Sequence, residues 1–331
     1  MKSRFLVGVA VLASVSLTIG GSAAAQRLGR IRAMIQTEKQ QRARVPADPN
    51  MTPVSGPGDY RFSFIHGGLT REYLVHVPKS YRGASTPLLI ALHGGGGNAD
   101  YQADDSKYGL ISKSEQAGFI LIFPNGYSRL PGGILSTWNA GACCGAAQKN
   151  NVDDVAFIRE VIRRVERQAK IDPQRIFATG MSNGAMMSWQ LACELPEIRA
   201  IAPVEGTDNT AACTPAHPVA VIEFHAIDDP NVPFNGGIGT GPSHTDYRSV
   251  PASQAKWVQL DRADPKARRV LTVPGAHCDL HGAGHGGAPV ELCVTDTGGH
   301  SWPGGGTQEG RKQPSLAISA NDLMWNFFSS L

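Results

Sequence analysis

Short apolar runs separated by polar or Gly-rich segments recur along the chain from about residue 60 onward. The runs cover residues 72–77, 88–92, 119–123, 176–179, 200–204 and 219–224. They are bounded by Gly, Pro or polar residues and are almost continuously apolar, which is typical of strands buried on both faces. We therefore predict a mostly parallel sheet covered by helices.

Apolar residues at helical spacing lie between these runs. Those from Val155 to Val165 form one stripe with Arg and Glu elsewhere, and Asp153 or Asp154 is a suitable N-cap. The pattern also predicts helices over residues 182–194, 253–260 and 318–328. Strands alternating with helices indicate an α/β architecture with right-handed crossovers. The Gly- and His-rich segments 230–250 and 274–290 are predicted to be surface insertions.

The N-terminal residues follow a different pattern. Lys2 and Arg4 precede an apolar stretch over residues 5–19, and the small residues Ala23-Ala24-Ala25 follow it. This is the architecture of a secretory signal peptide, and we predict cleavage after Ala25; an uncleaved membrane anchor is the alternative. Residues 26–58 are predicted to form a polar helix and a Pro-rich linker, and residues 59–331 a single domain.

The distribution of charge narrows the possible partners. The formal charge is +3, but the first 50 residues carry a basic surplus of six, which leaves residues 51–331 at −3. A nucleic-acid-binding surface therefore has no support in the composition. No apolar run after the leader is long enough to span a membrane. We expect a secreted or periplasmic protein, monomeric and free of the membrane once the leader is removed.

Six cysteines, an even number, suit an exported protein with disulfides. The C-x-x-C pairs of a zinc site are absent from the sequence, so the cysteines do not favour a metal. Cys278 and Cys293 flank a Gly-rich loop and could join neighbouring strands. The pairing of the other four cysteines is left open: Cys143, Cys144, Cys193 and Cys213.

A candidate nucleophile lies where the apolar run 176–179 meets a predicted helix. The intervening sequence Gly180-Met181-Ser182-Asn183-Gly184 has the G-x-S-x-G pattern, in the strand–turn–helix context that a nucleophile elbow requires. Small residues two positions either side of the serine let strand and helix approach closely. We predict that Ser182 is a nucleophile; a tight turn without chemistry is the alternative.

A serine nucleophile needs an imidazole to accept its proton and a carboxylate to orient that imidazole. Asp228 and Asp229 follow the run 219–224, and we choose Asp229, which begins D-P-x-V-P, with Asp228 in reserve. His300 follows the alternating run 290–295 and precedes the last predicted helix. The order serine, acid, histidine is the one expected for this arrangement.

Three other histidines lie at four-residue spacing in a Gly-rich segment: His277, His281 and His285. Such spacing suits metal binding on a helix, but the glycines oppose a helix there. A solvated loop is the preferred interpretation, and we predict neither a metal nor a cofactor.

The chemistry also needs two backbone N–H groups that face a developing oxyanion. Asn183, the residue after the serine, is predicted to supply one of them. The loop His93-Gly94-Gly95-Gly96-Gly97-Asn98 is predicted to supply the other from Gly95, with Gly94 or Gly96 as alternatives. A phosphate-binding loop is excluded, because no Lys-Ser or Lys-Thr pair follows.

Taken together, these motifs resemble the secreted polyhydroxybutyrate-depolymerase and feruloyl-esterase branch of the α/β-hydrolases. The resemblance rests on HGGGGN, STWNAGACCG, NVDDVAFI, GMSNGAMM, the His-x-x-Asp-Asp-Pro-x-Val-Pro run and GGHSWPGG. It implies an α/β-hydrolase catalytic domain over residues 59–331, with Ser182, Asp229 and His300 as catalytic triad. It also implies oxidised cysteines at positions 143, 144 and 193. The chain departs from the family in lacking a cysteine soon after Trp257 and in having Cys293 instead, which we interpret as a disulfide relocated to Cys278.

The loops that border the serine suggest the class of substrate. Trp138, Trp302 and His93 are predicted substrate-binding residues; packing that supports the loops is the alternative for the two tryptophans. We expect a small or oligomeric ester as substrate, with feruloyl or related aromatic esters first. Fragments of polyhydroxybutyrate or another polyester are the alternative, and a non-catalytic binding protein of the same fold is the hypothesis from another class.

Overall fold

The computed structural model describes residues 54, 56–130, 133–308 and 312–331. The predicted signal peptide and most of the predicted arm and linker over residues 26–58 lie outside the described residues. The described residues belong to one compact unit that spans residues 45–331. Within the described ranges, no helix is both long and apolar enough to cross a membrane.

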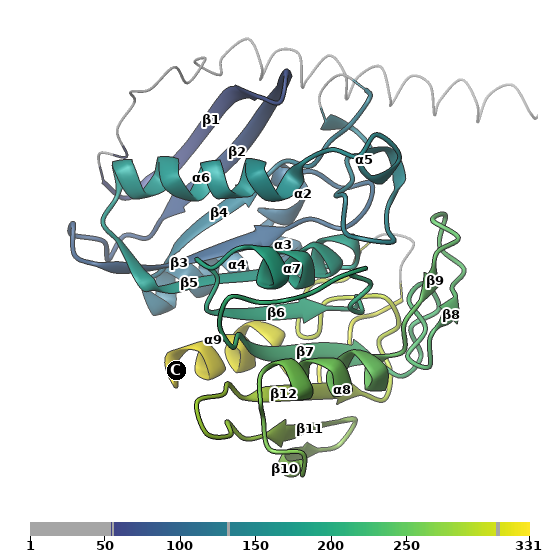
Figure 1. Cartoon of the computed structure of the whole chain (residues 1–331). Helices are drawn as coiled ribbons and strands as arrows, with labels where there is room; N and C mark the ends of the chain where they lie inside the picture. The colour runs from purple at the N-terminus through teal and green to yellow at the C-terminus, as the bar shows by residue number, and fades with distance from the viewer. Residues whose placement is uncertain (1–53, 55, 131–132, 309–311) are drawn as a thin grey trace, which may run out of the picture. The chain divides into compact units, whose positions relative to one another are not determined.

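Ten of the described strands form one sheet, in the order β1-β2-β4-β3-β5-β6-β7-β12-β11-β10 (Figure 1). Its centre is parallel. The central strands are β4 (Ile120–Pro124), β3 (Thr86–Leu92), β5 (Ile171–Met181), β6 (Ala200–Val204), β7 (Ala220–Ala226) and β12 (Val290–Thr295). The predicted mostly parallel sheet is confirmed, and every predicted apolar run overlaps a strand of it.

Antiparallel strands complete the sheet at both sides. One side is formed by β1 (Gly58–His66) and β2 (Leu69–Val77), and the other by β11 (Ala276–His281) and β10 (Arg268–Val273). The prediction that residues 274–290 form a surface insertion was therefore wrong in its first part. Ala276 and Cys278 are buried while His277 between them is partly exposed, so a one-sided strand lies beneath the Gly- and His-rich composition.

Helices cover both faces of the sheet. The side chains of α6 (Asp154–Gln168), α7 (Asn183–Glu194) and α8 (Val250–Leu260) pack in one apolar cluster. The opposite cluster holds residues of α2 (Ala99–Gln102), α3 (Asp105–Tyr108), α4 (Leu110–Ala117) and α9 (Ala320–Ser329). The remaining elements are the short α5 (Gly145–Lys149) and the small hairpin of β8 (Gly237–Ile238) and β9 (Asp246–Tyr247).

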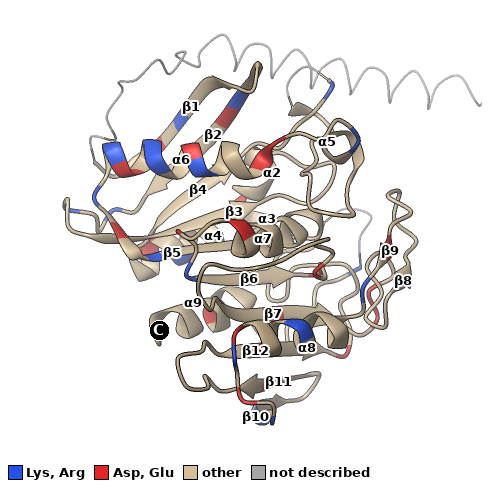
Figure 2. Cartoon of the chain, in the orientation of Figure 1, with Lys and Arg blue, Asp and Glu red and all other residues tan. Residues whose placement is uncertain are grey.

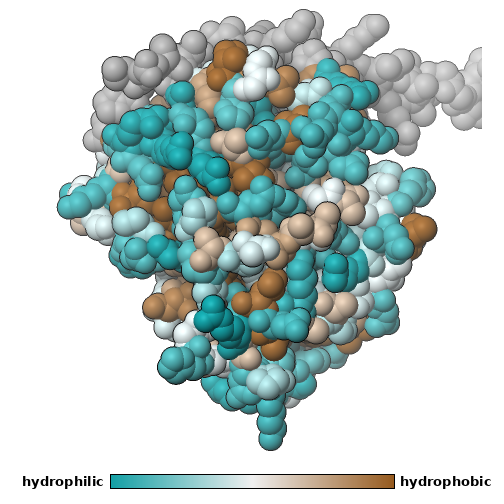
Figure 3. Space-filling view, in the orientation of Figure 1, coloured by the Kyte–Doolittle hydropathy of each residue, from teal (hydrophilic) through white to brown (hydrophobic). Residues whose placement is uncertain are grey.

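The central strands read as continuous apolar runs because both of their faces are covered. In β3, Leu88 and Ile90 join the cluster beneath α6 and α7, whereas Leu89 and Ala91 join the one beneath α9. Helix α6 is covered on one face only: most of its apolar residues are buried, and its charged residues are visible along the ribbon (Figure 2). Its predicted N-cap is confirmed at Asp153, whose carboxylate accepts from the backbone N–H of Ala156 over 2.9 Å. Apolar residues on the molecular face in Figure 3 are scattered rather than gathered in one patch.

The described structure contains three disulfides. Cys278 and Cys293 lie directly opposite each other on β11 and β12, as the sequence suggested. Disulfides of this number fit an oxidising extracellular compartment. The bonded pairs are Cys143–Cys144, Cys193–Cys213 and Cys278–Cys293.

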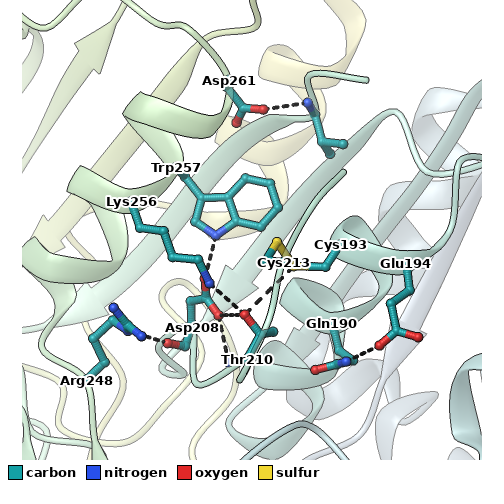
Figure 4. The surroundings of a disulfide bond; sticks show 11 residues. Gln190, Cys193, Glu194, Asp208, Thr210, Cys213, Arg248, Lys256, Trp257 and Asp261 are labelled. Atoms are coloured by element: carbon teal, nitrogen blue, oxygen red, sulfur yellow. Dashed lines mark hydrogen bonds and ion pairs between the residues drawn. A yellow bond between two sulfur atoms is a disulfide. The ribbon is translucent and has the colours of Figure 1, made fainter. Parts of the chain in front are cut away.

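The Cys193–Cys213 disulfide joins the end of α7 to the segment that follows β6 (Figure 4). Beside it lies Asp208, which is fully buried. Its carboxylate accepts from the indole N–H of Trp257 over 2.8 Å and pairs with Lys256 Nζ at 2.6 Å. This buried charge is therefore compensated, and the segment after β6 is tied to α8.

Candidate active site

Ser182 lies on the sharp turn between β5 and α7. Its φ of 57° is in the left-handed region, as expected of a strained strand–helix turn. A Cβ on Gly180 would lie 2.5 Å from the carbonyl oxygen of Gly184, and one on Gly184 would lie 2.2 Å from that of Leu92. Both flanking positions therefore require glycine, which explains the G-x-S-x-G pattern physically.

Neighbouring strands hold this turn at the carboxyl edge of the sheet. The backbone N–H of Ser182 donates to the carbonyl of Val204 at the end of β6 over 2.8 Å. A Cβ on Gly206 would lie 2.4 Å from the carbonyl oxygen of Ser182. The Ser182 residue is partly exposed. The turn thus lies against the segment that follows β6.

The structure separates the roles of the two neighbouring aspartates. Oδ2 of Asp229 accepts a hydrogen bond from Nδ1 of His300 over 2.7 Å, whereas Oδ1 of Asp228 accepts from the backbone N–H of Gly299 over 2.7 Å. Asp228 also forms an ion pair with Lys312. Asp229 orients the imidazole ring, and Asp228 fixes the backbone of the loop that carries it.

Asp229 is held as a carboxylate. Burial, the largest single influence, pushes its pKa upward, but the hydrogen bond and charge of His300, together with the neighbouring His225 and Glu205, bring the pKa below its usual value. Its other oxygen, Oδ1, accepts from the backbone N–H groups of Asn231 at 2.7 Å and Val232 at 3.1 Å. Because Nδ1 of His300 carries the proton donated to Asp229, Nε2 is the nitrogen left to accept another.

Strand order brings the serine, acid and histidine to one edge. Ser182 follows β5, Asp229 follows β7 and His300 follows β12, and these strands lie in the parallel order β5-β6-β7-β12. In the described structure, no hydrogen bond joins the Ser182 hydroxyl to His300. Such contacts often tighten only when substrate is bound.

The Gly-rich loop after β3 lies beside the start of α7. A Cβ on Gly95 would lie 3.6 Å from that of Asn183. Asn183 is the first residue of α7, where a backbone N–H has no partner within the helix. The N–H of Gly96 already donates to Ser136, and that of Gly97 to Gly94. Gly96 is therefore removed from the alternatives, while Gly95 and Gly94 remain.

His93 supports this loop from within. The residue is fully buried, and burial lowers the pKa of its imidazole to about 4, so the ring is neutral at pH 7. Its Nδ1 lies 2.8 Å from the carbonyl of Gly94, and its Nε2 accepts from the N–H of Gly126 over 2.9 Å. Nδ1 must then carry the proton. The prediction that His93 binds substrate is not supported, because the ring does not reach the surface.

The two tryptophans are also buried. Trp138 is 0% exposed, and its indole N–H donates to the carbonyl of His93 over 2.9 Å. Trp302 is 1% exposed, and its indole N–H donates to Asn321 over 3.0 Å. Neither ring offers a face to a ligand, so the structure favours the packing alternative for both over substrate stacking.

One residue at this edge was not predicted from the sequence. Glu205 directly follows β6, is 1% exposed, and contacts the side chains of Asp229 and His225. The signal that would have found it is an acidic residue immediately after an apolar strand, the same signal that pointed to Asp228 and Asp229.

Comparisons with known proteins concern the family and the fold of the chain. Residues 71–227 match the family described as Esterase PHB depolymerase. Feruloyl esterase C of Emericella nidulans is 32% identical over 201 residues, which cover 56% of this chain and 68% of that protein. Feruloyl esterase B of Piromyces equi is 28% identical over 241 residues, which cover 70% of this chain but only 42% of that protein. The chain thus spans less than half the length of the Piromyces protein.

A solved structure supports the fold. The acetyl xylan esterase from Aspergillus awamori superposes with a TM-score of 0.54 at 15% identity, covering 79% of this chain and 94% of that one. At this identity the likeness concerns the fold alone.

Proposed function

Since the chain belongs to the polyhydroxybutyrate-depolymerase and feruloyl-esterase family and has the α/β-hydrolase fold, we propose that it is a serine carboxylic-ester hydrolase. The observation that carries the proposal is the 2.7 Å hydrogen bond between Asp229 and His300. It lies at the sheet edge where Ser182 occupies a strained turn. Ser182, His300 and Asp229 are the proposed triad.

In the proposed reaction, Oγ of Ser182 attacks the ester carbonyl while Nε2 of His300 accepts its proton. Asp229 keeps Nδ1 protonated and stabilises the imidazolium that forms. The N–H groups of Gly95 and Asn183 stabilise the oxyanion. The protonated His300 then gives its proton to the leaving alcohol. Water, activated by the same imidazole, hydrolyses the acyl-enzyme.

We propose feruloyl or related hydroxycinnamoyl esters as the substrate class. Two relatives named as feruloyl esterases support this choice. Fragments of polyhydroxybutyrate are the second candidate, favoured by the description of the matching family. The buried Trp138 and Trp302 favour neither class.

Turnover of methyl ferulate, a hydroxybutyrate dimer and an aryl diester distinguishes these substrates. A kcat/KM for methyl ferulate at least tenfold above that for the dimer supports the first choice. The reverse order supports a depolymerase, and lack of activity on methyl ferulate contradicts the proposed substrate.

A fluorophosphonate probe tests the class of chemistry. The wild-type protein is expected to be labelled, and Ser182→Ala is expected to abolish labelling. An unlabelled wild-type protein would favour the non-catalytic binding protein, and labelling that survives the substitution would assign the nucleophile elsewhere.

The proposed setting is the periplasm or the extracellular medium, with the protein acting as a monomer on small or oligomeric esters. The disulfides support an oxidising compartment. Sequencing the N-terminus of the exported protein should give Gln26 as the first residue, and size-exclusion chromatography should give the mass of one chain. A retained leader or a larger assembly would contradict these assignments.

A further inference from the structure

Glu205 occupies the strand end between the proposed nucleophile and the proposed acid. Strand β6, which it follows, lies between β5 and β7. The backbone N–H of Glu205 donates to the carbonyl of Phe224 over 2.9 Å. The two carboxyl oxygens of Glu205 lie 3.0 and 3.2 Å from the backbone nitrogen of Ala226. Its φ of 50° is a left-handed value that is uncommon for a residue with a side chain. The side chain is therefore held in place at a strained backbone position.

The carboxyl group of Glu205 is aimed at the carboxyl group of Asp229. One carboxyl oxygen of each residue and one ring nitrogen of His225 form a buried group in which these three atoms lie within 4.8 Å of one another. The two carboxyl groups are thus close enough for a hydrogen bond between them, and each shifts the pKa of the other. Two carboxylates buried this close repel each other strongly, so one of them retains a proton. A hydrogen bond between two carboxyl groups requires that proton as well.

The pattern of donors shows which carboxyl group is charged. Asp229 accepts from the backbone at Asn231 and Val232 and from His300, and each of these bonds stabilises a carboxylate. Glu205 accepts from a single backbone N–H, that of Ala226.

The nearby imidazole does not change this assignment. Nε2 of His225 donates to the carbonyl of Val232 over 2.9 Å and lies farther from both acids, 3.5 Å from Glu205 and 3.6 Å from Asp229. The charge of His225 lowers the pKa of Asp229, which favours the same assignment. Nδ1 of His225 faces Glu223 at 3.7 Å. Burial, and then the charge of Asp229, raises the pKa of Glu205 well above its usual value, in agreement with this pattern.

We propose that Glu205 is a positioning residue for the proposed triad: a protonated acid whose O–H donates a hydrogen bond to Asp229 and holds that carboxylate toward His300. The inference rests on the proposed function. It adds a second acidic residue, from the neighbouring strand, that acts through Asp229 and does not touch the substrate.

Two substitutions of Glu205 distinguish a hydrogen-bonding role of its side chain from a role in packing alone. Glu205→Gln keeps an N–H donor for Asp229 and an oxygen acceptor for Ala226, whereas Glu205→Met keeps the approximate volume and removes both. Glu223→Gln is the matched control, because Glu223 is equally buried and lies near His225 but bonds to Gln254 rather than to Asp229.

The measurements are kcat and the pH profile of kcat/KM on an aryl ester. Glu205→Gln is expected to keep kcat within about threefold and to leave the profile unchanged. Glu205→Met is expected to lower kcat at least about tenfold, because the variant loses one hydrogen bond to a charged group and a bond of that strength corresponds to about that change in rate. The acidic limb of the Glu205→Met pH profile is expected to move to higher pH, because Asp229 without this donor stabilises the His300 imidazolium more strongly. Glu223→Gln is expected to match the wild type.

The proposal is overturned if folded Glu205→Met retains the wild-type kcat and profile, or if Glu205→Gln loses as much activity as Glu205→Met. If Glu205→Met does not fold, infrared spectroscopy decides. At pH 8, where a group such as Asp261 with a pKa of about 7 is mostly ionised, the difference spectrum between wild type and Glu205→Gln should contain the carbonyl stretch of one protonated carboxylic acid; a difference spectrum without that band overturns the proposal. A wild-type protein that shows the band but hydrolyses no ester would instead contradict the proposed function.

Discussion

Nδ1 of His300 lies 2.7 Å from Oδ2 of Asp229, while the adjacent Asp228 bonds to the backbone one residue before that histidine. Two acids that are neighbours in sequence thus act on the same loop in different ways. Asp229 interacts with the imidazole itself, and Asp228 with the chain that carries it.

This difference predicts unequal effects of two matched substitutions. Asp229→Asn should lower kcat by about 10³- to 10⁴-fold, because an amide no longer holds the required histidine tautomer or stabilises the imidazolium. Asp228→Asn keeps an acceptor for Gly299 and should lower kcat by less than about tenfold. Steady-state kinetics on an aryl ester checks both, and equal losses would contradict the assignment of the acid to Asp229.

Gly184 is predicted to tolerate no side chain. A Cβ there would lie 2.2 Å from the carbonyl oxygen of Leu92 and 2.6 Å from that of His93. Gly184→Ala should therefore destabilise the protein by at least about 1–3 kcal/mol and reduce kcat. Gly282→Ala is the control, because no atom lies within 4 Å of its added Cβ. Chemical denaturation measures both, and a Gly184→Ala protein as stable as the control would be inconsistent with this packing.

Trp138 is predicted to matter for stability rather than for choice of substrate. Trp138→Phe removes the indole N–H that bonds the carbonyl of His93. An unsatisfied buried carbonyl should lower the free energy of unfolding by about 1–3 kcal/mol. The ratio of kcat/KM for methyl ferulate to that for a short acetyl ester should remain within about threefold. A selective loss of ferulate turnover would restore the stacking interpretation.

Asp261 is predicted to make stability depend on pH. Burial raises the pKa of its carboxyl group to about 7 from 3.8, although the N–H of Val219 bonds to it. The folded protein therefore binds this proton more tightly than the unfolded chain. The resulting contribution to stability is complete below about pH 4 and is lost as pH rises through about 7.

Asp261→Asn should remove this dependence. At pH 8 the free energy of unfolding of the variant should exceed that of the wild type by at most about 4 kcal/mol. This bound is the free-energy equivalent of the difference between the pKa of Asp261 in the folded protein, about 7, and its ordinary value of 3.8. Urea unfolding at pH 5 and pH 8 measures the change. The prediction fails if the difference in stability between variant and wild type is the same at both pH values.

The Cys193–Cys213 disulfide is predicted to stabilise the fold more than the Cys143–Cys144 disulfide through chain entropy. The first joins residues 20 positions apart, and the second joins adjacent residues. Replacing the first pair by alanine should cost about 3 kcal/mol. The vicinal disulfide closes no comparable loop in the unfolded chain, so its replacement by alanine should cost less stability. Thermal unfolding of the two double variants compares them, and equal losses would contradict the argument.

The sequence predicted the parallel centre of the sheet because strands covered on both faces are apolar throughout. It did not predict β11, where only alternate residues such as Ala276 and Cys278 are buried among polar neighbours. For the site, local context was sufficient for the turn at Ser182 and for the strand-end position of Asp229. The burial of Trp138 and the contact between Glu205 and Asp229 depend on how distant segments pack, which no local pattern records.

The strand order that brings the candidate site together also governs when the site can form. The residues joined by the His300–Asp229 hydrogen bond are 71 positions apart, and Ser182 lies on another strand end, with β6 between its strand and that of Asp229. Pairing between segments so distant in the chain requires closure of long loops and is slow. Hydrolysis should therefore return late during refolding, after helical circular dichroism has recovered, because no fragment shorter than β5 to the His300 loop contains all three residues.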